Sequence, residues 1–153
     1  MRYFIQFSYF GKAYHGWQNQ PNAITVQEVL ENALSVLLSE KIELVGAGRT
    51  DAGVHAREMY AHFDFKANTD KIDLIYRLNS FLPGDIAVTN IHAVVDEAHA
   101  RFDALQRTYE YWICNAKNPF LQEAAHYVKH PLDIALMNKA AELLLGKQDF
   151  ECF

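Results

Sequence analysis

Few cysteines and no long apolar run are present in this chain, and these absences argue against two classes of protein. Only two of the 153 residues are cysteine, Cys114 and Cys152, and they lie too far apart for a zinc motif or a disulfide framework. No stretch approaches the roughly 18 apolar residues that cross a bilayer. The first residues also lack the apolar segment and cleavage site of a signal peptide. We therefore expect a cytoplasmic protein with reduced thiols.

An excess of basic residues is also missing. The net charge is −5, with 14 lysines and arginines against 19 acidic residues, whereas nucleic-acid-binding proteins commonly carry a basic surface. Four arginines nevertheless fall in or beside the motifs described below: Arg49, Arg57, Arg101 and Arg107. Because a guanidinium can hold a phosphate with two hydrogen bonds and stack on a base, these residues predict a local basic cleft on an acidic body.

The apolar pattern predicts one complete α+β unit followed by part of another. Strands are expected at residues 3–10, 42–45, 59–66 and 86–95. Helices are expected at 25–38, capped by Thr25 and Glu28, and from Thr69 or Asp70 to Pro83. The order βαββαβ is typical of a ferredoxin-like, RRM-like unit, an antiparallel sheet with two helices on one face, here over residues 1–98. Residues 99–153, with a strand at 108–114 and a helix at 133–145, predict the beginning of a second, incomplete α+β domain.

The most informative segment is the glycine-rich run from Gly46 to Ala56, between two expected strands. Its glycines permit close approach of another backbone or a ligand, and small residues surround Asp51. Arg49 lies two positions earlier, so in an extended backbone the two side chains could pair and keep Asp51 ionised even in a dry pocket. Such a carboxylate can act as nucleophile or base. The other reading is an ordinary hairpin loop in which Asp51 caps a turn.

The residue string itself favours a site. Gly48 to Ala56 reads Gly-Arg-Thr-Asp-Ala-Gly-Val-His-Ala, which closely resembles the signature of the tRNA pseudouridine synthase A family. The similarity runs from Tyr3 to the last residue. Four further segments resemble that family in the expected order: Tyr9–Gln20, Leu82–Ile86, His99–Ala104 and Arg107–Tyr111. One position departs from the pattern, because Phe10 stands where the family usually carries Asp.

The resemblance implies an isomerase that converts uridine to pseudouridine at positions 38, 39 and 40 of the tRNA anticodon stem-loop, as a homodimer without cofactor or metal. Asp51 is then the catalytic residue and Arg49 its neighbour. Tyr109 is expected to stack on the target base, and Arg57, Arg101 and Arg107 are candidate phosphate contacts. The family's fold joins two ferredoxin-like units around a cleft. This chain looks cut short within the second unit, so we expect it to be inactive alone.

Two other functions fit parts of the sequence. A non-catalytic RNA-binding module of the same fold would tolerate the replacement of Asp51 by asparagine, because base stacking and phosphate contacts would survive. A metal-dependent hydrolase using Asp51, His55 and His62 would be inactivated by chelators. The hydrolase is the weaker alternative, since no further ligand with suitable spacing accompanies these residues.

Overall fold

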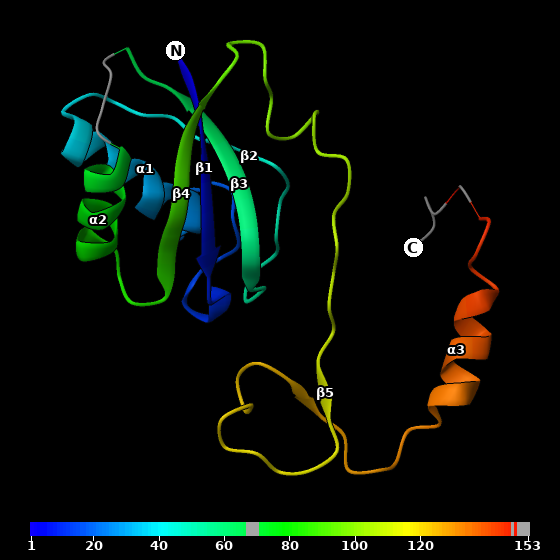
Figure 1. Cartoon of the computed structure of the whole chain (residues 1–153). Helices are drawn as coiled ribbons and strands as arrows, with labels where there is room; N and C mark the ends of the chain where they lie inside the picture. Colours follow the sequence, from blue (N-terminus) through cyan, green and yellow to red (C-terminus); the bar gives the residue numbers. More distant parts are fainter. Residues whose placement is uncertain (67–70, 148, 150–153) are drawn as a thin grey trace. The chain divides into compact units, whose positions relative to one another are not determined.

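The structure is a computed structural model that describes residues 1–66, 71–147 and 149 (Figure 1). The chain divides into two compact units, Met1–Arg107 and Thr108–Phe153, and each is considered by itself. A domain boundary between residues 98 and 99 stays a prediction. No helix in the described part of the chain is long and apolar enough to cross a membrane.

A four-stranded antiparallel sheet forms the first unit, in the strand order β2-β3-β1-β4. Helices α1 and α2 lie on one side of it (Figure 1), and a short 3-10 helix, Gly11–Ala13, follows the first strand. The elements run in the order β1 (Arg2–Tyr9), α1 (Val26–Leu38), β2 (Val45–Gly46), β3 (Ala56–Asp64), α2 (Lys71–Phe81) and β4 (Ile86–Val94).

The core lies between the sheet and the two helices. Alternate residues of β1 are buried, and Ile5 has no exposed surface. The apolar residues that alternate along the expected strand 59–66 are also buried, as a period-two pattern predicts: Met59, Ala61, Phe63 and Phe65. Leu30 and Leu34 of α1 and Leu78 of α2 pack into the same cluster. The period-two and helical patterns therefore identified the buried faces.

The start of α1 is confirmed, whereas the strand expected after it is largely wrong. Thr25 is the N-cap, and its hydroxyl accepts a hydrogen bond from the Glu28 amide at 3.3 Å. Of residues 42–45, only Val45 lies in a strand. The amides of Ile42 and Leu44 instead donate to side-chain oxygens of α1, at 2.9 and 2.8 Å. These bonds replace the ladder that a neighbouring strand would supply. The expected caps Thr69 and Asp70 lie outside the described residues.

The second difference concerns the sheet face opposite the helices. His62 alternates with the buried apolar residues of β3, so a period-two pattern places it on the outer face. It is nevertheless 4% exposed, because the segment Ala98–Arg107, which we call the strap, lies against it. Its Nδ1 accepts a hydrogen bond from the Ala100 amide at 3.1 Å, and its ring meets that of His99 edge-on. Burial, followed by the nearby Arg2 charge, lowers the pKa of His62, so the neutral ring can keep accepting this bond.

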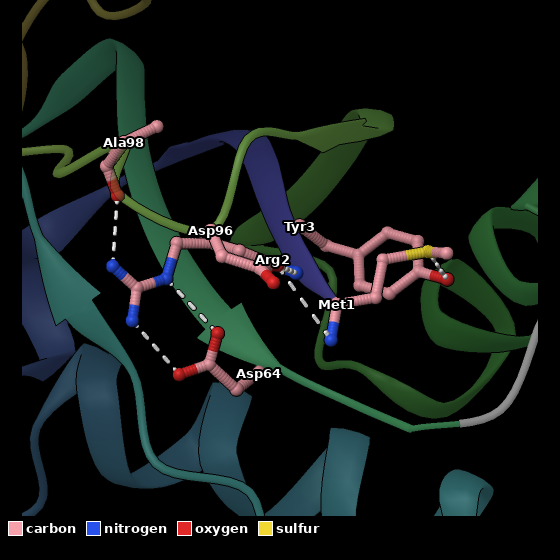
Figure 2. A network of polar contacts seen from close by, with 6 residues as sticks. All are labelled: Met1, Arg2, Tyr3, Asp64, Asp96 and Ala98. Carbon is pink, nitrogen blue, oxygen red and sulfur yellow. Dashed lines mark hydrogen bonds and ion pairs between the residues drawn. The ribbon is translucent and has the colours of Figure 1, made fainter.

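Arg2 ties the beginning of the strap to the sheet (Figure 2). Its guanidinium donates to both carboxylate oxygens of Asp64, at 2.9 and 2.8 Å, and to the carbonyl of Ala98 at 2.9 Å. Its amide donates to Asp96 at 3.2 Å. One arginine thus joins β1, β3 and the segment that leaves β4.

The bond between Arg2 and Asp64 predicts a small loss of stability in acid. The Arg2 guanidinium lowers the pKa of the Asp64 carboxyl below its usual value. A carboxyl whose folded pKa is lowered contributes stability that is present above the unfolded pKa and is lost as the pH falls through the folded pKa. Because the Asp64 side chain is 63% exposed, we expect a contribution of at most about 1 kcal/mol.

The test is urea unfolding at neutral pH and below about pH 4. Between these two conditions, Asp64→Asn should lose less stability than the parent chain. In an Arg2→Gln background the same change should leave the pH dependence unaltered, and an equal effect in both backgrounds would contradict the assignment.

The second unit contains little regular structure. A two-stranded parallel pair joins β5 (Ile113–Cys114) to β6 (His126–Tyr127), and one helix follows, α3 (Ile134–Glu142). The strand predicted at 108–114 is therefore present only at its end. The predicted helix is confirmed with a shorter C-terminal end, and Asp133 caps it by accepting from the Leu136 amide at 2.9 Å.

No side chain is buried among the described residues of this second unit, 108–147 and 149. Tyr111, in the middle of the strand expected at 108–114, is 78% exposed. An alternating strand needs an apolar surface to cover its inner face, and within this unit none is available. The absence of that surface explains why the sequence pattern overestimated the strand.

Candidate active site

The glycine-rich run lies between β2 and β3, as the sequence indicated. We call residues Ala47–His55 the Asp51 loop. The side chain of Asp51 is exposed, and no described residue makes a hydrogen bond or an ion pair with its carboxylate. Its backbone carbonyl accepts from the Val54 amide at 3.2 Å, which closes a tight turn just after it.

The end of β1 and the segment that follows it, residues 9–17, hydrogen-bond to the Asp51 loop. The Trp17 amide donates to the carbonyl of Thr50 at 3.1 Å, and the Gly53 amide donates to the carbonyl of Tyr14 at 3.3 Å. The hydroxyls of Tyr9 and Thr50 share a hydrogen bond of 2.8 Å. The residues before and after Asp51 are therefore both fixed, although its carboxylate is free to meet a ligand.

Glycine is required where these two segments meet. Gly16 has a φ of +87°, and a Cβ there would overlap the carbonyl oxygen of Thr50. A Cβ on Gly11 would likewise overlap the carbonyl oxygen of Val54. Gly46 has the ring of Trp17 against it, 2.6 Å from an ideal Cβ. Trp17 itself is buried and stacks on Phe7, so it supports the loop and does not line an open edge.

The Leu-Pro-Gly-Asp turn, residues 82–85, is hydrogen-bonded to the segment after β1. The Tyr14 hydroxyl donates to Asp85 at 2.6 Å, and the Phe10 amide donates to the carbonyl of Asp85 at 2.8 Å. Burial, followed by this hydrogen bond, raises the pKa of the Tyr14 hydroxyl, so it stays protonated as the donor. The Leu-Pro-Gly-Asp turn therefore acts on the Asp51 loop through Tyr14.

Phe10, the position that departs from the family pattern, contacts the far end of the loop. Its ring stacks on His55 with 3.9 Å between centroids and 13° between planes. His55 Nδ1 accepts a hydrogen bond from the Gly11 amide at 2.9 Å. The side-chain contact at position 10 is thus a ring stack in this chain, where an aspartate would offer a polar contact.

The candidate arginines differ in the contacts they make. Arg49 and Asp51 form no ion pair within residues 1–66, 71–147 and 149. Arg107 is engaged by the protein: its guanidinium donates to the carbonyl of Ala47 at 2.7 and 3.2 Å and to that of Arg101 at 2.9 Å. Arg49, Arg57 and Arg101 are exposed.

The remaining candidates are a tyrosine and two histidines. Tyr109 is 77% exposed and belongs to the second unit. Among the described residues no group of three His, Cys, Asp or Glu side chains could hold a metal ion. The Nδ1 atoms of His55 and His62 each accept a backbone amide.

Sequence reasoning missed the residues that brace the loop. Tyr9, Tyr14 and Asp85 lie in the quoted motifs, yet no role was assigned to them, because their partners are about 40 to 70 residues away in the chain. The signal that was available is the motifs themselves: three separated segments of unusual composition converge on one loop.

Comparison with known proteins agrees with this convergence. A family described as tRNA pseudouridine synthase matches residues 5–103. Relatives named tRNA pseudouridine synthase A include those of Azobacteroides pseudotrichonymphae and Parabacteroides distasonis, each 49% identical over 99% of this chain, and that of Thermoanaerobacter sp. strain X514, 43% identical over 97%. The chain spans 61 to 62% of the length of these relatives. From the matched residues and the level of identity, the chain belongs to the tRNA pseudouridine synthase family.

Proposed function

We propose that this chain carries the catalytic aspartate, Asp51, of an enzyme that isomerises uridine to pseudouridine in tRNA. The observation that carries the proposal is the contrast at Asp51: its backbone is held on both sides, while its carboxylate is exposed and makes no described contact. A residue that served only to cap a turn would direct its oxygens to backbone amides.

The exposed position of the Asp51 carboxylate suits a reaction at a nucleotide that approaches from the solvent side of the loop. The bond between C1′ of the ribose and N1 of uracil breaks, the uracil turns, and C1′ bonds to C5, while a proton leaves C5 and N1 gains one. The base must first leave its stack to reach a protein side chain. An exposed carboxylate on a braced loop can meet the flipped nucleotide as nucleophile or as base.

The finer features of the family complete the proposal. The order of elements and the strand order of the first unit support a ferredoxin-like arrangement. We propose anticodon stem-loop uridines at positions 38, 39 and 40 as targets, a homodimer as the assembly, the cytoplasm as the location, and no requirement for a cofactor or metal. Arg49, Arg57 and Arg101, which like Arg107 are exposed residues, are candidate contacts to the flipped nucleotide and its phosphates.

The test uses a tRNA transcript with tritium at C5 of its uridines. The 153-residue chain is compared with a chimera in which the C-terminal part of the Parabacteroides distasonis relative follows residue 153. We expect tritium release and pseudouridine from the chimera, undiminished by EDTA, and none from the 153-residue chain alone. Loss of activity with EDTA would favour the metal-dependent alternative. Binding of the tRNA by the chimera without release would favour the RNA-binding module.

Tyr109 provides a second test of the same proposal. If its exposed ring stacks on the target base, Tyr109→Phe should retain most of the chimera's activity and Tyr109→Leu should lose about 10- to 100-fold, because one stacked base contributes about 1–3 kcal/mol. Tyr76→Leu on α2, an equally exposed tyrosine, is the matched control and should behave like the parent. Equal activity of the two Tyr109 variants would count against stacking.

A further inference from the structure

The guanidinium of Arg107 bridges the beginning of the Asp51 loop and a backbone segment that is distant in the sequence. Its Nη2 donates to the carbonyl of Ala47 at 2.7 Å and to that of Arg101 at 2.9 Å, and its Nε donates to Ala47 at 3.2 Å. Ala47 and Arg101 are 54 residues apart, and their carbonyls belong to the loop and to the strap. We propose that Arg107 is a positioning residue that locks the Asp51 loop to the strap, and that it is not a phosphate contact.

The fit at Gly48 supports this role. An ideal Cβ at Gly48 would lie 3.4 Å from Nε and 3.8 Å from Cδ of Arg107. These distances are those of ordinary van der Waals contact, so the Arg107 side chain lies directly beside the backbone of Gly48 as its guanidinium reaches the carbonyl of Ala47.

The strap is itself anchored at two further points. The guanidinium of Arg2 donates to the carbonyl of Ala98, and the amide of Ala100 donates to the buried His62. The strap can therefore serve as a fixed support, and Arg107 at its end transmits that support to the loop four residues before Asp51. This role rests on the proposed function of Asp51, but the contacts themselves do not.

Hydrogen exchange provides a test that needs neither activity nor RNA. The Trp17 and Gly53 amides report on the docked loop, because they donate to the carbonyls of Thr50 and Tyr14. In the 153-residue chain we expect both Arg107→Gln and Arg107→Lys to accelerate their exchange by about tenfold, the effect of losing one charge-assisted hydrogen bond. Lysine should fail because a single ammonium group lacks the planar fork that reaches both carbonyls. Amides of β1 and β3 should keep their rates.

Arg77→Lys on α2, where Arg77 pairs with Asp73 at 3.7 Å, is the matched control and should leave both loop amides unchanged. Changes of less than twofold at Trp17 and Gly53 in the two Arg107 variants, or full restoration by lysine, would overturn the proposal. The salt dependence of tRNA binding provides an independent test. Arg107→Gln should leave the slope of log K against log salt unchanged. A slope that is smaller in magnitude by about 0.7 to 0.9 would identify Arg107 as a phosphate contact and would also overturn the proposal.

Discussion

Asp51→Asn is expected to reduce pseudouridine formation by about 10⁴-fold or more, the scale seen when a catalytic side chain is removed from a site that is otherwise intact. The amide keeps the shape of the carboxylate but is neither a nucleophile nor a base. The Asp51 side chain is exposed and makes no described hydrogen bond, so the free energy of unfolding should change by no more than about 0.5 kcal/mol.

The measurement is tritium release by the chimera under single-turnover conditions, with urea unfolding of the same proteins. Asp73→Asn, an exposed aspartate of α2, is the matched control for loss of one negative charge and should retain full activity. Activity of Asp51→Asn within a few-fold of the parent would remove Asp51 from the mechanism. A large loss of stability would show that the carboxylate has a structural role that the described contacts do not contain.

Local patterns predicted the elements of the first unit well where burial and periodicity agree. The alternation in β3 and the threonine cap of α1 both follow from interactions within a few residues. The pattern failed at residues 42–45, because the Ile42 amide donates to Ser35 and the Leu44 amide to Glu31, both on α1. An apolar alternation shows which side chains are buried, but not which group accepts the backbone hydrogen bonds.

At the candidate site too, features that are local in the sequence were predicted and contacts between distant segments were not. The sequence directed attention to the loop and to Asp51, because a string of small residues around one carboxylate is visible locally, and the role of Asp51 stays a prediction. It offered Arg107 as a candidate phosphate contact and Arg49 as a possible partner of Asp51. The structure instead shows Arg107 donating to two backbone carbonyls and no ion pair between the described Arg49 and Asp51. The direction of a long side chain depends on carbonyls that come from other segments, which a local pattern does not contain. The roles of Tyr14 and Asp85 were hidden for the same reason.

Gly16→Ala is expected to destabilise the chain strongly, because this position combines a left-handed backbone with a close neighbour. Gly16 has a φ of +87°, which costs a residue with a Cβ about 1–2 kcal/mol. The new Cβ would also overlap the carbonyl oxygen of Thr50, so the loop must move and the hydrogen bond from Trp17 to that oxygen is lost. We expect a total cost of about 3 kcal/mol in the free energy of unfolding of the 153-residue chain. In the chimera, a displacement of ~1 Å beside Asp51 should cost about 100-fold in turnover.

Two other glycines separate the backbone cost from the overlap. Gly53 has a φ of +80° but no atom within 4 Å of an ideal Cβ. Gly53→Ala should therefore cost only the free energy of the left-handed conformation, about 1–2 kcal/mol. Gly84 has neither a positive φ nor a close neighbour, and Gly84→Ala should be neutral or stabilise by up to about 1 kcal/mol. Urea unfolding of the three variants gives the comparison. If Gly16→Ala costs no more than Gly53→Ala, the loop can yield to a methyl group without loss, and the close contact between the Asp51 loop and the segment after β1 does not hold Asp51 in place.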